Sequence, residues 1–171
     1  MSTEFEITRR GLERPTEILR LRSGDDDRGE DFVLTRRTHP IAEIRAHYPP
    51  VWALNDDERS IVLGFNRQIV VLVVEPSLAV SKSYEVGSPV VEFVRLAGGD
   101  WLVMCQADVM RVNQGGASIW WTATDHIEDY RIEDDTLFVQ TMDGSNPRIS
   151  LENGLLIAEG TSWPSERVRG C

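Results

Sequence analysis

The sequence has no long apolar run and no segment that resembles a secretory signal peptide. Its longest uninterrupted apolar run, Ile69 to Val74, is six residues, whereas a membrane-spanning helix needs about twenty. The stretch MSTEFEITRR at the start is charged from Glu4 onward and has no apolar core of signal-peptide length. We therefore expect a cytoplasmic protein that has no contact with a membrane.

Cysteine and histidine are also scarce, with two and three residues respectively. Cys105 lies within an apolar run and Cys171 is the last residue, so neither disulfide nor CxxC spacing is present. His39, His47 and His126 do not have the spacing of a zinc site, and the sequence contains no HExxH. A G-x-S-x-G elbow and a phosphate-binding glycine loop are missing as well. We expect no metal, no cofactor and no catalytic residue of these classes.

Basic residues are too few to balance the acidic ones, which gives a net charge of -10. Residues 51–171 hold nine basic and eighteen acidic residues, so most of the negative charge lies there. Such a surface repels phosphate backbones, and we expect no nucleic acid as a ligand. A basic protein partner is the better match. Lys82 is the only lysine beside seventeen arginines, which indicates the coding bias of a GC-rich bacterial genome.

From Ser60 onward, short β-type runs alternate with turn residues, and no amphipathic stretch there is long enough for a standard helix. Sequential strands joined by such short turns are antiparallel, because a parallel crossover needs a dozen or more residues. The fold class we expect is mainly β, an antiparallel meander arranged as a sandwich, a barrel or blade-like stacked sheets, with one short helix. The eleven candidate strands are residues 60–66, 68–75, 78–86, 89–97, 101–105, 108–113, 118–123, 126–133, 136–142, 148–153 and 155–160.

A loose internal repeat accompanies these strands. Its apolar starts at Ile61, Leu102 and Leu137 are separated by 41 and 35 residues, and each unit contains about four short strands. TLFVQTMDGSNPRISLENG, within residues 101–154, resembles a blade of the quinoprotein-type β-propellers, in which strands and DG or NG turns recur. Three units cannot close a ring that needs four to eight blades. The resemblance therefore implies stacked four-stranded meanders, with a complete propeller formed only through oligomerisation.

The N-terminal third has a different pattern. FEITRR at residues 5–10 recurs as FVLTRR at 32–37, and both alternate as strands do. GDDDRGED at 24–31 is a charged loop with little apolar content. HPIAEIRAHYPP at 39–50 predicts the short helix, with a proline in its first turn and a proline pair at its end.

The length favours a single domain over residues 1–171. Within it we distinguish an N-terminal part of strands, acidic loop and helix at 1–57, a β-meander core at 58–160 and a C-terminal tail at 161–171.

The segment IWWTATDHIEDYRIEDD, from Ile119 to Asp135, contains two tryptophans, a histidine and six carboxylates. Paired carboxylates beside tryptophans are typical of glycoside hydrolases, but strand alternation puts Glu128 and Asp129 on opposite faces. The adjacent tryptophans must also point to opposite faces, so one faces the core and the other is exposed unless both faces of the sheet are covered. The candidate partner-binding residues are Trp120, Trp121, Asp125, His126, Glu128 and Asp129.

These observations predict a non-enzymatic bacterial protein that acts as an acidic recognition module for a basic protein partner. Two alternatives stay open: a small hydrolase that uses clustered carboxylates, and a structural subunit of a homo-oligomer.

Overall fold

The computed structural model describes residues 5–9, 18–23 and 28–159. Within this part the chain forms sixteen strands in four four-stranded sheets, which we number along the chain. Sheet 1 contains β1 (Phe5–Arg9), β2 (Leu19–Arg22), β3 (Glu30–Arg36) and β4 (His39–Ala46), and sheet 2 contains β5 (Val51–Leu54), β6 (Ser60–Phe65), β7 (Gln68–Val73) and β8 (Ala79–Glu85). Sheet 3 contains β9 (Val90–Arg95), β10 (Trp101–Cys105), β11 (Asp108–Val112) and β12 (Ser118–Ala123), and sheet 4 contains β13 (Ile127–Glu133), β14 (Thr136–Thr141), β15 (Pro147–Ser150) and β16 (Leu156–Glu159). The expectation of a mainly β chain built from stacked four-stranded meanders is confirmed.

Sheets 2, 3 and 4 are simple antiparallel meanders in which the strand order follows the chain. Tight turns join their strands, and Asn66 and Asp134 adopt positive φ angles of 47° and 50° in two of them. Asn and Asp tolerate this left-handed backbone better than most residues do. Sheet 1 is different, because its order is β1-β3-β4-β2 and β2 pairs with β4 in parallel.

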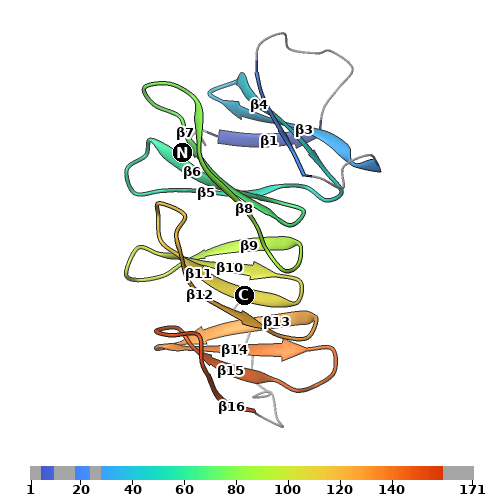
Figure 1. Cartoon of the computed structure of the whole chain (residues 1–171), viewed down its shortest axis with the longest axis vertical. Helices are drawn as coiled ribbons and strands as arrows, with labels where there is room; N and C mark the ends of the chain where they lie inside the picture. The colour runs from blue at the N-terminus through green and yellow to red at the C-terminus, as the bar shows by residue number, and fades with distance from the viewer. Residues whose placement is uncertain (1–4, 10–17, 24–27, 160–171) are drawn as a thin grey trace, which may run out of the picture.

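The four sheets are stacked face to face from sheet 1 to sheet 4 (Figure 1). Three hydrophobic clusters fill the three spaces between successive sheets. Sheets 2 and 3 are therefore covered on both faces, and every residue of β6 and of β10 is buried. A strand that is buried on both faces reads as a continuous apolar run, which explains the sequences SIVLGF and WLVMC.

On the outer face of sheet 4, two arginines lie over the aromatic ring of Phe138. Leu137 and Val139 of β14 lie in the core shared with sheet 3, so Phe138 between them points the other way. There its ring lies 4.6 Å from the guanidinium carbon of Arg131 and 5.3 Å from that of Arg148. Charged side chains thus cover the last aromatic ring of the stack.

The first strands of the sheets lie next to one another along one side of the stack. Phe5 of β1 packs against Trp52 of β5, with ring centroids 5.6 Å apart. The Tyr130 hydroxyl of β13 donates to the Glu92 carboxylate of β9 at 2.7 Å. We call this the first-strand side; β8, β12 and β16 form the opposite edges of their sheets.

The connections between sheets repeat one hydrogen-bonding pattern. The Val90 N–H at the start of β9 donates to the Asn66 carbonyl at 2.7 Å, and the Ile127 N–H at the start of β13 donates to the Gln106 carbonyl at 2.7 Å. Asn66 and Gln106 occupy the same position, directly after the second strand of sheets 2 and 3. β9 and β13 are therefore each held at the central turn of the preceding sheet.

The prediction of a helix at 39–50 is wrong, because residues 39–46 form strand β4. Ala42, Ile44 and Ala46 alternate toward the core between sheets 1 and 2, and β4 pairs with both β3 and β2. Pairing on both sides supplies the backbone hydrogen bonds that a short helix would otherwise make internally. The strands β2 and β5 were also missing from the sequence-based prediction.

The other segment predictions agree with the described residues. All eleven strands expected from residue 60 onward are present, within a residue or two at their ends for most of them. Both TRR-containing repeats form strands, β1 and β3, which pair with each other. Part of the predicted acidic loop, residues 24–27, lies outside the described residues, while Glu30 and Asp31 already belong to β3.

The internal repeat corresponds to the sheets. Ile61, Leu102 and Leu137 lie on β6, β10 and β14, which are the second strands of sheets 2, 3 and 4. The alignment is offset by one residue in sheet 3, because Ile61 and Leu137 face the preceding sheet whereas Leu102 faces the following one.

Candidate functional site

Trp120 is part of the core between sheets 3 and 4. Its side chain is buried in the cluster that includes Leu137 and Val139, and its indole N–H donates to the Leu151 carbonyl at 3.0 Å. Gly154 of the next sheet lies directly against the ring. Trp120 therefore joins two sheets and presents little surface to a partner.

Trp121 points to the opposite face of β12, toward sheet 2, where it pairs across strands with Met110. Its side chain is 53% exposed, and Ile119 on the same strand is 47% exposed. The Trp121 indole N–H donates to Oδ1 of Asp108 at 3.1 Å. We call Ile119 and Trp121 the rim patch, because they lie on the outermost strand of sheet 3.

Asp108 holds the Trp121 side chain of the rim patch in place. Asp108 as a whole residue is 2% exposed, and its carboxylate accepts a second hydrogen bond, at 2.5 Å, from the Ser88 hydroxyl in the connection between sheets 2 and 3. The Ser88 oxygen in turn accepts the Ala107 N–H at 2.9 Å. Gly87 lets this connection approach closely, since a Cβ there would lie 2.8 Å from Asp108 Oδ2 and 3.5 Å from the Trp121 ring. The hydrogen bond to Asp108 and the close approach of Gly87 thus hold the indole in its orientation.

Cys105 lies in the core beside this carboxylate. Burial raises the pKa of its thiol well above the usual range, and the neighbouring Asp108 raises it further. A thiol in such surroundings is almost never the reactive thiolate. Cys105 therefore acts as a small hydrophobic side chain, as its position in an apolar run predicts.

The predicted acidic residues do not form a single cluster with the tryptophans. Asp125 and His126 lie on the connection that crosses from β12, at one edge of sheet 3, to β13 on the first-strand side. Glu128 and Asp129 lie on β13 itself, next to β9. The structure thus separates the rim patch from Glu128 and Asp129 by the width of a sheet.

Glu128 and Asp129 line a small cavity of about 210 Å³, together with Glu92, Met104 and Ile127 among others. Neither Trp120 nor Trp121 is part of that lining. A sugar-stacking surface beside these carboxylates, as the hydrolase alternative requires, is not formed by the predicted residues.

Within the described ranges, no group of three or more His, Cys, Asp and Glu side chains is arranged to hold a metal ion. The same part of the chain contains no helix with the length and apolar character needed to cross a membrane.

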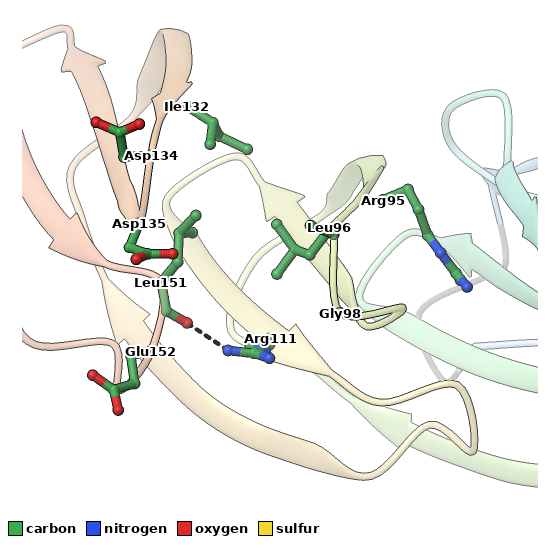
Figure 2. Close-up of a pocket in the computed structure, with 10 residues that line it drawn as sticks. Arg95, Leu96, Gly98, Arg111, Ile132, Asp134, Asp135, Leu151 and Glu152 are labelled. Carbon is green, nitrogen blue, oxygen red and sulfur yellow. Dashed lines mark hydrogen bonds between the residues drawn. The ribbon is translucent and has the colours of Figure 1, made fainter.

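A larger cavity, which the sequence did not reveal, lies between sheets 3 and 4 at the end of the stack opposite the Asn66 turn. It measures about 510 Å³ and opens among three turns, those between β9 and β10, β13 and β14, and β15 and β16. Figure 2 shows Asp134, Asp135 and Glu152 on its sheet 4 side and Arg111 on its sheet 3 side. We call Asp134, Asp135 and Glu152 the sheet 4 wall of this cavity. Turns that are far apart in the sequence form this cavity. The sequence shows that these turns contain acidic residues, but it does not show that they lie close together.

Arg111 is the central cation of this cavity and is already paired. Its Nη2 lies 2.6 Å from Oδ2 of Asp100, and its Nη1 donates to the Leu151 carbonyl at 2.9 Å. The second guanidinium, that of Arg95, points away from sheet 4 in Figure 2. It pairs with Asp56 of sheet 2 and lies 4.4 Å from the Trp101 ring centroid.

No protein-family model matches the chain, and no curated protein matches it in sequence. Among solved structures, the fold is similar to Sqt1 from Saccharomyces cerevisiae, a WD40 protein, with a TM-score of 0.54 and 10% sequence identity over 74% of this chain and 40% of Sqt1. It is also similar to the β-propeller BamB from Moraxella catarrhalis, with a TM-score of 0.48 and 15% identity over 90% of this chain and 51% of BamB. The chain thus spans about half the length of these proteins or less.

The likeness to Sqt1, which covers 74% of this chain, agrees with the internal geometry, because sheets 2, 3 and 4 are four-stranded antiparallel meanders like the blades of a propeller. The resemblance of residues 101–154 to blade repeats is therefore confirmed, and no particular family of propellers is identified.

Proposed function

We propose that this chain is a protein-binding module that docks its partner on the rim patch of Ile119 and Trp121. One observation carries the proposal: Trp121 is half exposed, yet its indole is fixed by a hydrogen bond to the buried Asp108. Tryptophan is enriched among the residues that dominate binding energy at protein interfaces. A ring that is already immobilised loses little conformational entropy when it binds.

The chemistry of the partner follows from the charge of the chain. The net charge is -10, and Asp125 and His126 are exposed at the same end of sheet 3 as Trp121, with Glu128 exposed further along β13. A basic protein would be attracted to such a surface, and the attraction would weaken as salt screens it. We therefore propose a basic partner and keep the predicted residues Asp125, His126, Glu128 and Asp129 as its polar contacts.

Affinity capture from the native host with matched variants tests the proposal. Trp121→Ala removes the ring, whereas Val80→Ser changes an apolar residue that is 41% exposed on the outermost strand of another sheet. We expect the wild type and Val80→Ser to retain the same partner and Trp121→Ala to lose it, with a cost of at least about 2 kcal/mol in the purified complex. A partner that binds Trp121→Ala as tightly as the wild type would contradict the rim patch.

The charge component has its own test. A variant with Asp125→Asn, Glu128→Gln and Asp129→Asn should bind the same partner more weakly and with a smaller dependence on salt. If the triple variant keeps the affinity and the salt dependence of the wild type, these residues do not face the partner.

A further inference from the structure

The lining of the cavity between sheets 3 and 4 has two parts, an apolar surface and the carboxylates of the sheet 4 wall. Leu96, Ala97, Ile132 and Leu151 supply the apolar part, and Leu151 is 7% exposed. The side chains of Asp134, Asp135 and Glu152 are exposed and are spread along the sheet 4 side of the opening (Figure 2). A ligand that fits both surfaces needs an aliphatic portion that ends in a positive charge.

The arginines of the cavity do not neutralise this wall. Arg111 is paired with Asp100, and Arg95 is paired with Asp56, so each guanidinium has its own carboxylate on the sheet 2 or sheet 3 side. Within residues 5–9, 18–23 and 28–159, no ion pair neutralises Asp134, Asp135 or Glu152, so these carboxylates give the opening of the cavity a negative charge. Charge complementarity therefore favours a cation from outside.

We propose that this cavity receives an arginine side chain of a basic protein partner. The aliphatic portion would lie along Leu96, Ile132 and Leu151 as long cationic side chains do on apolar surfaces. The guanidinium would then meet carboxylates from two different turns, those of Asp134–Asp135 and of Glu152. A planar fork of five N–H donors can satisfy several carboxylate oxygens at once, which a compact ammonium cannot do.

This inference rests on the proposed function, since it assigns a second contact to the same basic partner, but the cavity and the rim patch can be tested separately. The cavity lies on the sheet 4 side of sheet 3, whereas Trp121 lies on its sheet 2 side. A short peptide that enters the cavity does not require the rim patch.

The probe is the peptide acetyl-Gly-Gly-Arg-Gly-Gly-amide, titrated into the full chain with isotope-labelled Ile and Leu methyl groups. Its control is the same peptide with citrulline, which has nearly the same shape as arginine and no charge. We expect saturable shifts of the Ile132 and Leu151 methyl signals with the arginine peptide and none with citrulline. Equal shifts with both peptides, or no saturable shift with either, would overturn the proposal.

Two double variants test whether the carboxylates of the sheet 4 wall bind the arginine peptide. Asp135→Asn with Glu152→Gln should weaken binding of the arginine peptide by about tenfold, since two exposed ion pairs are lost. Glu6→Gln with Glu58→Gln removes the same charge from exposed side chains on β1 and in the turn between β5 and β6, and should leave the peptide affinity unchanged. An equal loss in both variants would show an effect of net charge alone and would overturn the site.

Trp121→Ala separates this inference from the proposed function. We expect the variant to bind the arginine peptide as the wild type does. If the peptide binds the cavity while Trp121→Ala keeps its full affinity for the protein partner, the rim patch fails and the cavity stands. If Trp121→Ala loses the partner and the peptide does not bind, the cavity fails and the rim patch stands.

Discussion

Gly154 lies so close to Trp120 that a Cβ added to Gly154 would come within 2.7 Å of the indole ring. The two residues belong to different sheets, Trp120 to β12 and Gly154 to the turn before β16. The Gly154 carbonyl also accepts the Thr122 hydroxyl at 2.5 Å. The outer strand of sheet 3 and the last turn of sheet 4 are thus in direct contact through a backbone that has no room for a side chain.

Gly154→Ala should therefore destabilise the protein by about 2–4 kcal/mol, because it combines a clash with Trp120 and a positive φ of 73°. Gly144→Ala is the matched control, since Gly144 has a φ of 79° and, apart from its chain neighbours, no described residue has an atom within 4 Å of the added Cβ. Its cost should be only about 1 kcal/mol. Urea denaturation of both variants gives the difference, and equal losses would show that the contact with Trp120 can relax freely.

Asn55 and Trp101 couple sheets 2 and 3. The Trp101 indole N–H donates to Oδ1 of Asn55 at 2.7 Å, and Asn55 Nδ2 donates to the Ser60 hydroxyl oxygen at 2.9 Å. Both Asn55 and Trp101 are buried. Asn55→Ala leaves the indole N–H without this partner and should cost about 2–3 kcal/mol.

A double-mutant cycle isolates that contact. Trp101→Phe removes the donor, and in this background Asn55→Ala should cost less by at least about 0.5 kcal/mol. Denaturation midpoints of the four proteins measure the coupling, and strictly additive losses would show that the hydrogen bond contributes nothing.

The two neighbouring tryptophans should differ in their effect on stability. Trp120→Ala removes a buried ring between two sheets and should cost about 3–5 kcal/mol. Trp121 is half exposed, so Trp121→Ala should cost roughly 1–2 kcal/mol, mainly through the lost hydrogen bond to Asp108. Denaturant unfolding of both variants ranks them, and a larger loss for Trp121→Ala would contradict the assignment of Trp120 to the core.

Tyr84 predicts a dependence of stability on high pH. Burial raises the pKa of its hydroxyl from 10.0 to about 12. Its buried hydroxyl oxygen has no hydrogen-bond partner in the part of the chain that the structure describes. The stabilising effect of the neutral form is complete below the unfolded pKa of 10.0. It is lost as the pH rises through the folded pKa, because the unfolded chain releases the proton first.

Tyr84→Phe cannot ionise and has no unsatisfied hydroxyl, so it should be as stable as the wild type or more stable at pH 7. Between pH 10 and about 12 its free energy of unfolding should fall less than that of the wild type. Tyr48→Phe is the control, since Tyr48 is 58% exposed, and it should follow the wild-type curve. Identical pH curves for Tyr84→Phe and the wild type would show that this hydroxyl is solvated.

Most strands after residue 60 could be predicted because their signal is local. A run such as WLVMC between turn residues indicates a buried strand whatever its neighbours are. The segment at 39–50 gave the opposite signal, because two flanking prolines and a short apolar stripe resemble a helix. Pairing with β3 and β2 decided its conformation, and such pairing partners cannot be identified from the segment itself.

The candidate site was only partly accessible to the sequence. Alternation correctly required Trp120 and Trp121 to lie on opposite faces, but it could not tell which of them faces the core. The alternation also could not show that Glu128 and Asp129 lie on the first-strand side of the stack, away from the rim patch. Strand order and sheet packing settle both questions.

By itself the sequence determined the short strands, their tight turns, the blade-like repeat and the negative charge, since each depends on residues within a few positions of one another. Only the tertiary structure decided which tryptophan is exposed, which carboxylates line a cavity and how Arg111 is paired. Those features depend on contacts between turns that are brought together by the stacking of separate sheets. The physical reason is that stacking is driven by the summed apolar area of whole sheet faces, and no single segment carries that information.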